Sequence, residues 1–174
     1  GNKKPVLQEY NVVIGNPPYG AHRGVYKGLG EESKISRYED YFVKRSLDVL
    51  TDGGVLAMVL PSSWLDRQKQ AKGYDVVRAY RLPSGAFAGT KIGTDIVVLR
   101  KNESAKPMDV SNYFDVHPER VLGEEKERTG RFGRQEKYID GNIDAALSTI
   151  QRDEAIDMAK ELGLPHDTDT LNEV

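Results

Sequence analysis

Residues 16–19 read Asn-Pro-Pro-Tyr and directly follow the apolar run Val12–Ile14 and Gly15. Proline has no N–H group for a strand ladder, and it favours an extended conformation in the residue before it. We therefore expect residues 10–14 to form a buried strand that ends in a stiff turn. In open α/β folds this position is the carboxyl edge of the sheet, where ligands bind.

The turn, which we call the Asn-Pro-Pro-Tyr turn, offers two acceptors and one ring. Asn16 carries a side-chain carbonyl, Pro17 provides a backbone carbonyl, and Tyr19 has a flat aromatic face. Two acceptors beside a stacking ring suit a planar group that carries an exocyclic amine, such as adenine.

The residues after the turn predict an alternating α/β pattern. Apolar side chains recur at helical spacing from about Tyr38 to Leu50, and Gly53-Gly54 suit a helix end. The continuous apolar run Val55–Leu60, closed by Pro61, predicts a second buried strand that is parallel to the first.

Two further strands are predicted over Val76–Leu82 and Asp95–Arg100. Their connection, Pro83–Thr94, is too short for a crossover helix, so the two strands should pair antiparallel. Residues 62–73 are expected to be a polar connection. The order of strand, helix, strand and hairpin is half of a doubly wound α/β sheet.

The character of the chain changes after Lys101, and we place a boundary between residues 1–106 and 107–174. The second part is charged and partly helical. It contains a candidate short helix over 110–116, an irregular stretch over 120–134 and a helix over 143–162. We expect the acidic side of this last helix to face solvent.

Composition narrows the class of protein. A length of 174 residues with 38% hydrophobic and 30% charged residues suits one globular domain with a core. The chain has no cysteine, which excludes disulfides and cysteine-ligated metals and favours a cytoplasmic protein. It also has no apolar run near the ~20 residues that a membrane-spanning helix needs, so no membrane partner is expected.

The charge distribution permits phosphate contacts. The net charge is −2, but residues 151–174 carry seven acids and two bases, which leaves +3 on residues 1–150. Arg23, Lys27 and Lys34 lie in the glycine-rich stretch after the turn and are candidate nucleic-acid contacts, although a solvated loop is the simpler interpretation. His22 and His117 have no second ligand at metal spacing, so we expect no metal site.

The Asn-Pro-Pro-Tyr turn resembles motif IV of the amino-group methyltransferases that use S-adenosylmethionine, especially the gamma-type N6-adenine-specific DNA methyltransferases. Residues 80–87 and 94–99 are similar to the strand, aromatic loop and strand that carry motif VIII. Residues 39–42 and 52–55 are similar to the helix and strand between the two motifs.

The resemblance extends beyond this core. Residues 112–114, 117–119 and 121–123 look like sequence that follows the methylase core in large plasmid- and phage-borne helicase–methylase proteins. The implied fold is a partial Rossmann-like S-adenosylmethionine-dependent methyltransferase sheet with an antiparallel C-terminal hairpin, in which residues 1–106 are the C-terminal half of the catalytic domain. The implied source is a bacterium or a mobile element.

By this resemblance the reaction is methyl transfer from S-adenosylmethionine to adenine N6 in DNA. An aromatic amine is a poor nucleophile because its lone pair is delocalised into the ring. If Asn16 and Pro17 accept hydrogen bonds from its two N–H groups, the nitrogen becomes pyramidal and its lone pair can point at the methyl group. Tyr19 would stack on the flipped base beside Pro18, and Phe87 would cover the other face.

The chain also departs from the family pattern. The glycine-rich cofactor loop and the acid after the second strand lie upstream of motif IV in the gamma order, and this chain begins about nine residues before its motif IV strand. The nearest glycine-rich stretch, Gly24–Gly30, follows the motif instead. The expectation is a fragment that does not methylate alone, although the parent activity is that of an adenine-specific DNA methyltransferase.

Alternative functions remain open on the sequence. Glutamine-modifying and some RNA methyltransferases use related strings, and a non-catalytic module that binds nucleic acid or a partner is a second class. Strand 10–14 would lack a neighbour on one side, so we expect association with the missing N-terminal half, self-association through this sheet edge, or cover by the C-terminal helix. Arg81 either lines the site or pairs with Asp95, and Trp64 is expected to pack in the core or at an interface.

Overall fold

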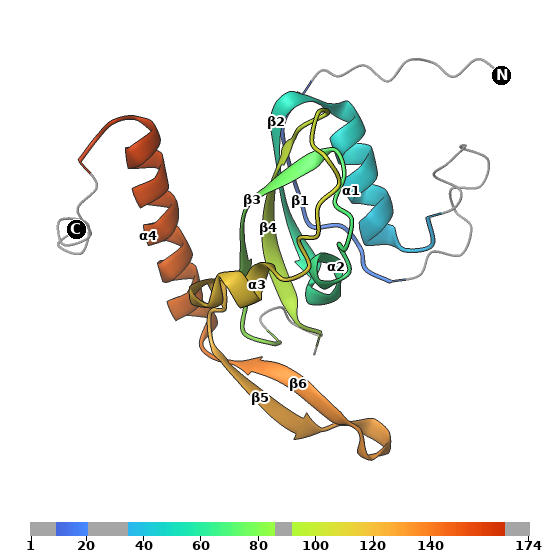
Figure 1. The fold of residues 1–174 in the computed structure, drawn as a ribbon. Coiled ribbons are helices and arrows are strands. Elements are labelled where there is room, and N and C mark those ends of the chain that lie inside the picture. The colour runs from blue at the N-terminus through green and yellow to red at the C-terminus, as the bar shows by residue number, and fades with distance from the viewer. Residues whose placement is uncertain (1–9, 21–34, 86–91, 166–174) are drawn as a thin grey trace.

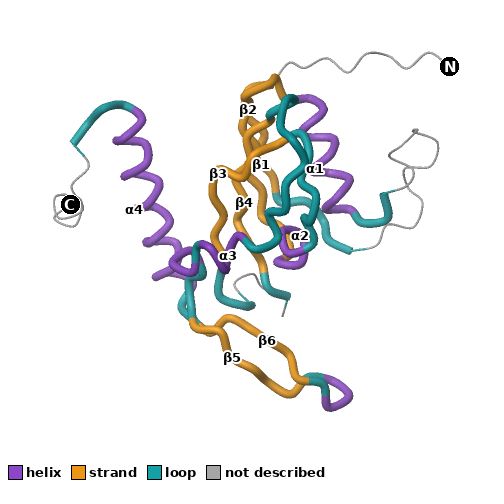
Figure 2. The backbone as a smooth tube through the Cα atoms, viewed as in Figure 1, coloured by secondary structure: helices purple, strands orange, loops and turns teal. Residues whose placement is uncertain are grey.

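The computed structural model describes residues 10–20, 35–85 and 92–165 (Figure 1). Figure 2 shows the same chain coloured by secondary structure. The elements, in chain order, are β1 (Tyr10–Gly15), α1 (Tyr38–Val49), β2 (Leu50–Pro61), α2 (Ser62–Asp66), β3 (Tyr74–Arg81), β4 (Thr94–Lys101), α3 (Tyr113–Val116), η2 (Pro118–Arg120), β5 (Glu124–Thr129), η3 (Arg131–Gly133), β6 (Gln135–Asp140) and α4 (Ile143–Glu161).

Four strands form one mixed sheet in the order β1-β2-β4-β3. β1 is parallel to β2, and β4 is antiparallel to both β2 and β3. The predicted parallel pair and the predicted antiparallel hairpin are therefore confirmed. The α/β fold class is confirmed with them. The polar connection predicted over 62–73 contains one short helix, α2, which its polar residues did not indicate.

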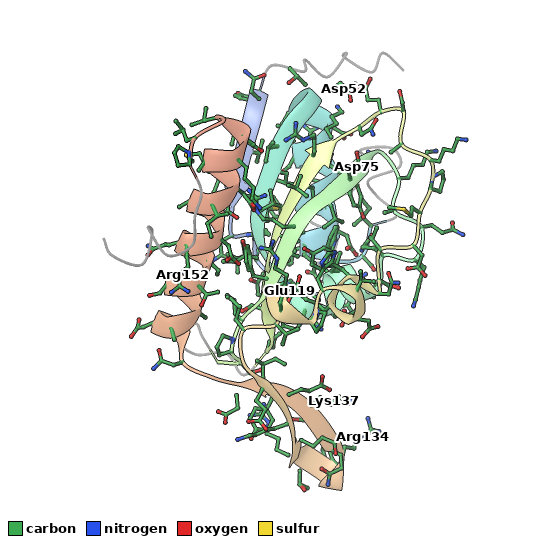
Figure 3. All side chains as sticks on the ribbon, turned by 60° about the vertical axis from the view of Figure 1, so that its left-hand side comes forward. Asp52, Asp75, Glu119, Arg134, Lys137 and Arg152 are labelled. Atoms are coloured by element: carbon green, nitrogen blue, oxygen red, sulfur yellow. The ribbon has the colours of Figure 1, made fainter. Side chains whose placement is uncertain are left out.

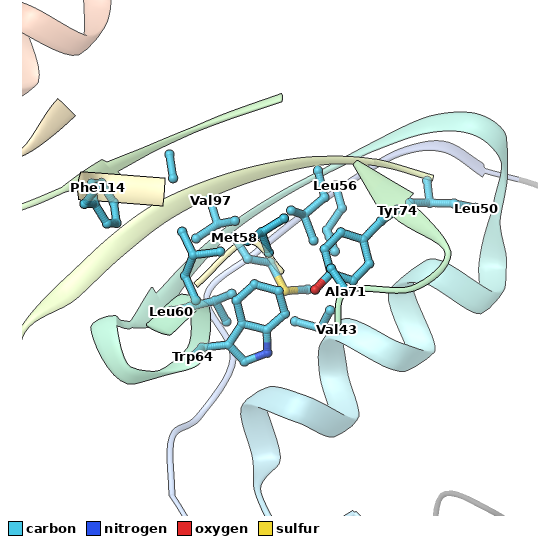
Figure 4. Close-up of a cluster of buried hydrophobic side chains, with 14 residues drawn as sticks. Val43, Leu50, Leu56, Met58, Leu60, Trp64, Ala71, Tyr74, Val97 and Phe114 are labelled. Carbon is cyan, nitrogen blue, oxygen red and sulfur yellow. The ribbon is translucent and has the colours of Figure 1, made fainter. Parts of the chain in front are cut away.

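One face of the sheet carries the core. Along β2, Leu56, Met58 and Leu60 are buried, because alternate side chains of a strand point to the same face. Val43 of α1 and Trp64 of α2 pack against this face (Figure 4). Trp64 is only 2% exposed, so its predicted place in the core is confirmed.

Residues after the predicted boundary at 106/107 also enter this core. Val110 and Phe114 belong to the same buried cluster, and the backbone of Met108 pairs with that of Ala71. The segment that leads into α3 therefore covers one end of the sheet and shares its hydrophobic core.

The prediction that residues 10–14 are buried is wrong. Val12 is 57% and Ile14 is 79% exposed. β1 pairs only with β2 among the described strands, and Val12 and Ile14 lie beside Val55 and Ala57, on the face opposite the core. The described helices α1 and α2 pack on the core face, so these apolar side chains of β1 face solvent.

The C-terminal helix α4 does not cover β1 in the described residues. It lies beside β3, where Arg78 is bonded to Glu154 and lies 3.2 Å from Asp157 (Figure 1). The expectation of a solvated acidic helix face is therefore wrong for Glu154 and Asp157. The helix begins at the N-cap Asn142, whose side chain accepts a hydrogen bond from the Ala145 N–H at 3.0 Å.

Residues 120–134 are not irregular as predicted, because β5 and β6 pair antiparallel in a two-stranded ribbon. The strand β5 reads Glu-Glu-Lys-Glu-Arg-Thr, so it lacks the apolar alternation from which strands are predicted. The ribbon is anchored at its base. The Ser84 N–H donates to the Ile139 carbonyl at 2.8 Å, and the Ile139 N–H donates to the Ser84 hydroxyl at 2.9 Å. None of the described helices is long and apolar enough to cross a membrane.

Candidate functional site

The Asn-Pro-Pro-Tyr turn lies at an edge of the sheet where four strand ends meet. β1 ends at Gly15 beside Met58 of β2, and β2 ends at Pro61 opposite Thr94, where β4 begins. Arg81, the last residue of β3, lies opposite Asp95. The predicted position at the carboxyl edge of the parallel pair is therefore confirmed.

Within the turn, Asn16 and Tyr19 are brought together. Asn16 and Pro18 are exposed, Pro17 is buried and Tyr19 is half-buried. The Tyr19 hydroxyl donates to the Val59 carbonyl at 3.1 Å and lies 3.4 Å from Asn16 Oδ1. The second distance is long for an O–H···O hydrogen bond, so the Asn16 oxygen keeps acceptor capacity.

The protonation of Tyr19 follows from its surroundings. Burial raises the pKa of the Tyr19 phenol, and the nearby carboxylates of Glu39 and Asp95 raise it further. The phenol is therefore neutral at physiological pH and acts as a donor that ties the turn to β2. Its ring belongs to the same side chain, so this hydrogen bond also orients the aromatic face.

A buried carboxylate supports the end of the turn. The Gly20 N–H donates to Glu39 Oε2 at 2.9 Å, and the Glu39 side chain is only 1% exposed. Its charge is balanced by Arg37 at 3.6 Å and Arg67 at 3.8 Å. Among the described residues, Glu39 Oε1 accepts no hydrogen bond. No role was predicted for Glu39. The signal that could have found it is an acid in the first turn of the helix that follows the motif.

A second buried pair joins β3 to β4 at the same edge. Arg81 donates to both oxygens of Asp95 at 2.9 and 3.0 Å, and the Ser62 hydroxyl also donates to Asp95 at 2.9 Å. Arg81 also donates to Asp66 at 2.9 Å. Burial lowers the pKa of Arg81, but the hydrogen bonds to Asp95 and Asp66 outweigh it, so the net pKa is raised. Of the two roles considered for Arg81, pairing with Asp95 is confirmed.

Four of the predicted site residues, Phe87, Arg23, Lys27 and Lys34, lie outside the described residues. The segment that contains Phe87 connects β3 to β4, and both flanking strands reach the edge that carries the Asn-Pro-Pro-Tyr turn. The roles of these four residues stay predictions. Among the described residues, no group of His, Asp and Glu side chains is arranged to hold a metal ion.

An open cavity of about 640 Å³ lies apart from the turn. It is lined by α1, by the segment after α2 and by the end of β4, with Lys44, Trp64 and Lys101 among its residues. No residue of the Asn-Pro-Pro-Tyr turn lines it. Among the described residues, the candidate site is therefore the sheet edge at the Asn-Pro-Pro-Tyr turn and not this cavity.

Comparisons with known proteins bear on the same segment. Residues 6–84 match the family described as Eco57I restriction-modification methylase. The Defense against restriction protein B of Escherichia phage P1 is 28% identical over 158 residues, which are 78% of this chain and 7% of that protein. The Type I restriction enzyme EcoEI methylase subunit of Escherichia coli is 26% identical over 144 residues, 76% of this chain and 29% of that protein.

Solved structures show a partial likeness. The M protein of the type I restriction enzyme EcoKI aligns with a TM-score of 0.44 at 20% identity, over 60% of this chain and 24% of that one. A modification subunit of a putative type I restriction enzyme from Vibrio vulnificus aligns with a TM-score of 0.43 at 18% identity, over 82% of this chain and 40% of that one. This chain spans less than a third of the length of the two curated relatives.

The family match covers the Asn-Pro-Pro-Tyr turn, α1, β2, α2 and β3, which are the elements of the site other than β4. The resemblance inferred from the sequence is thereby confirmed, because residues 6–84 match the Eco57I restriction-modification methylase family.

Proposed function

We propose that this chain carries the target-base side of a DNA methyltransferase that methylates adenine N6 with S-adenosylmethionine as the methyl donor. The observation that carries the proposal is the placement of Asn16 and Tyr19 together at the carboxyl edge of the β1–β2 pair. The family match of residues 6–84 and the methylase subunit among the relatives support the choice of methyl transfer.

Asn16 and Pro17 act in this proposal as paired acceptors for the amine. The Asn16 oxygen is only weakly engaged by Tyr19 at 3.4 Å, so an amine N–H can replace that contact without loss of a strong hydrogen bond. Two fixed acceptors hold the nitrogen lone pair toward the methyl group, and no strong base is needed before attack. Oriented polar groups of this kind contribute several kcal/mol to a transition state.

Tyr19 and Phe87 act as the stacking faces for the flipped base. The Tyr19 hydroxyl is held by the Val59 carbonyl, which fixes the ring at the edge of the sheet. Phe87 belongs to the connection between β3 and β4, whose ends reach the same edge. Stacking on an aromatic ring is worth roughly 1–3 kcal/mol per base, which offsets part of the cost of extruding the base.

S-adenosylmethionine supplies an electrophilic methyl group when it is bound. Among the described residues, no glycine-rich turn joins a strand to a helix, and such a turn is the usual cradle for a nucleotide-like cofactor in this fold class. We therefore assign no described residue to the cofactor. The described residues supply the amine-binding and base-stacking side of the reaction.

The test is transfer of a radioactive methyl group from S-adenosylmethionine to duplex DNA, followed by nucleoside analysis. The chain is assayed alone and mixed with upstream segments of restriction-modification methylases. Label is expected in N6-methyl-2′-deoxyadenosine, and Asn16→Ala should lower the rate by about 100-fold or more, as removal of one oriented polar group does elsewhere.

Asn112→Ala is the matched control, because Asn112 is exposed and its side chain makes no cap hydrogen bond. It should leave the rate unchanged. Absence of transfer in every mixture, or equal rates for Asn16→Ala and Asn112→Ala, would overturn the proposal. Label in RNA or in protein glutamine would show that the same site methylates that substrate instead of adenine in DNA.

A further inference from the structure

The β5–β6 ribbon separates its charges along its length. The tip, residues 128–134, contains Arg128, Arg131 and Arg134 and no acid. The stem, residues 124–127 and 135–140, contains five acids and two bases. The tip therefore carries +3 and the stem −3, so the ribbon presents a cationic end to any partner.

Both lysines of the stem are paired within the ribbon. Lys126 lies 2.7 Å from Asp140, and Lys137 lies 3.3 Å from Glu125. Arg128, at the border of tip and stem, lies 3.7 Å from Glu136 and over the ring of Tyr138. Arg134 is exposed and has no ion pair among the described residues. Figure 3 shows Arg134 at the outer part of the ribbon and Lys137 in the stem.

The tip also presents an aromatic side chain. Phe132 is 96% exposed and has a φ of 64°, in the left-handed region that bulky residues rarely adopt. Gly133 follows with a φ of 70°, and the Gly130 N–H donates to the Arg134 carbonyl at 2.7 Å to close the turn. A phenylalanine held outward in a strained conformation contributes nothing to the core, and such strain is common at ligand contacts.

The ribbon starts at the edge of the sheet that carries the candidate site. Its base is bonded to Ser84, and the Leu122 N–H donates to the Arg81 carbonyl at 2.8 Å. From there the ribbon extends away from the sheet (Figure 1). Six residues in each strand, at about 3.3 Å per residue, give a reach of roughly 20 Å. A polymer bound at the Asn-Pro-Pro-Tyr turn can therefore also meet the tip.

We propose that the ribbon tip, residues 128–134, binds duplex DNA beside the target base. Phe132 acts as an apolar wedge between neighbouring base pairs, and Arg134 contacts a backbone phosphate. Duplex DNA is the partner because a two-stranded ribbon fits a DNA groove and apolar wedges enter base steps. The tip has three arginines and no acid, so its positive charge is complementary to the phosphates of DNA. This inference rests on the proposed function in taking DNA as the substrate.

The first test is the salt dependence of binding of the full chain to a labelled duplex, followed by fluorescence anisotropy. Arg134→Gln should lower the slope of log K against log salt by about 0.9, the value for one lost phosphate contact. Lys137→Gln is the matched control, because it removes one charge from the stem, where Lys137 is paired with Glu125. It should leave the slope unchanged.

The second test uses Phe132→Ala and Phe132→Trp with a duplex that contains 2-aminopurine. Binding of the unchanged chain should raise the 2-aminopurine fluorescence, because a wedge unstacks the base. Phe132→Ala should abolish the rise and weaken binding by about fivefold or more, the lower end of the effect of one lost stacking ring. Phe132→Trp should retain both. Equal thermal unfolding midpoints would show that the variants are folded.

The proposal is overturned if the unchanged chain does not bind the duplex at low salt. It is also overturned if Phe132→Ala and Arg134→Gln bind like the unchanged chain. If the unchanged chain binds single-stranded DNA more tightly than the duplex, the tip is assigned to single-stranded DNA instead. If the tip variants lose binding to an acidic protein and keep binding to the duplex, the tip is assigned to a protein partner. Asn16→Ala separates the two proposals, because it should lower the rate of methyl transfer by about 100-fold or more and leave the salt slope and the 2-aminopurine signal intact.

Discussion

The carboxylate of Glu39 accepts a hydrogen bond from the Gly20 N–H at 2.9 Å, and this contact joins the first turn of α1 to the end of the Asn-Pro-Pro-Tyr turn. Gly20 has a φ of 99°, so the chain bends sharply here in a conformation that suits glycine. The buried carboxylate thus fixes where the turn leaves the sheet edge, although it does not itself face the proposed base.

Glu39→Ala should lower the free energy of unfolding by about 1.5–3 kcal/mol, because a charge-assisted hydrogen bond is lost and the partly buried Gly20 N–H is left unpaired. Asp40→Ala is the matched control one residue away. Its ion pair with Arg67 at 3.3 Å is partly exposed, so its effect should stay within about 1 kcal/mol. Urea unfolding of both variants measures this, and a larger loss for Asp40→Ala would contradict the assignment.

Arg81→Met should destabilise the fold by about 3–5 kcal/mol, because it leaves the fully buried Asp95 without its cation. Replacement of both partners, Arg81→Met with Asp95→Leu, should restore part of this loss, because no uncompensated charge then remains. Chemical unfolding of the single and double variants tests the coupling. A double variant that loses as much as the sum of two single variants would argue against a coupled pair.

The contribution of the contact between α4 and β3 to the stability of the fold should depend on pH. Burial raises the pKa of Glu154, but its hydrogen bond and charge interaction with Arg78 outweigh this, so the net pKa lies below the ordinary value of 4.5. The folded state thus holds this proton less tightly than the unfolded state. The pair stabilises the fold above pH 4.5, and its contribution disappears as the pH falls through the lowered pKa.

The check is the free energy of unfolding of the unchanged chain and of Glu154→Gln, measured from about pH 7 to about pH 3. The difference between them should be largest near neutral pH and should vanish toward the acidic end. Glu161→Gln, at the exposed end of α4, should show no such trend. A difference that does not change with pH would contradict the role of the Arg78–Glu154 pair.

Two variants of Tyr19 should distinguish the structural role of its hydroxyl from the base-stacking role of its ring. Tyr19→Phe loses the hydrogen bond to the Val59 carbonyl and should cost about 1 kcal/mol of stability, while it keeps the ring. Tyr19→Ala should also weaken binding of an unpaired adenine by about fivefold or more. Unfolding and oligonucleotide titrations measure both effects, and equal affinities for the two variants would exclude stacking on Tyr19.

Sequence patterns predicted the elements that depend on apolar periodicity. The run Val55–Leu60 forms the centre of β2, and helical spacing from Tyr38 placed α1 within one residue of its observed end. The burial of β1 was predicted wrongly, because an apolar run indicates a strand but does not say which neighbours cover it. Val12 and Ile14 lie on the face opposite the core, where α4 contacts Arg78 of β3 and both β1 side chains stay exposed.

The features that the sequence did not predict depend on charged residues. β5 and β6 form their ladder and cross-strand ion pairs from side chains that usually indicate a solvated loop. Glu39 is buried because two arginines and a backbone N–H, distant in sequence, converge on it. Such convergence depends on the fold and leaves no periodic signal. The roles of Phe87, Arg23, Lys27 and Lys34 stay predictions, as does the boundary between residues 1–106 and 107–174.

The most direct test of the central claim is a binding cycle between Asn16 and the N6 amine. The chain and Asn16→Ala are each titrated with duplexes that carry, at one unpaired position, either adenine or purine, which lacks the amine. The account predicts that the unchanged chain prefers adenine by about two- to tenfold, the value of one net hydrogen bond, and that Asn16→Ala loses this preference. Equal affinity of the unchanged chain for both duplexes, or an equal preference in both proteins, would contradict it.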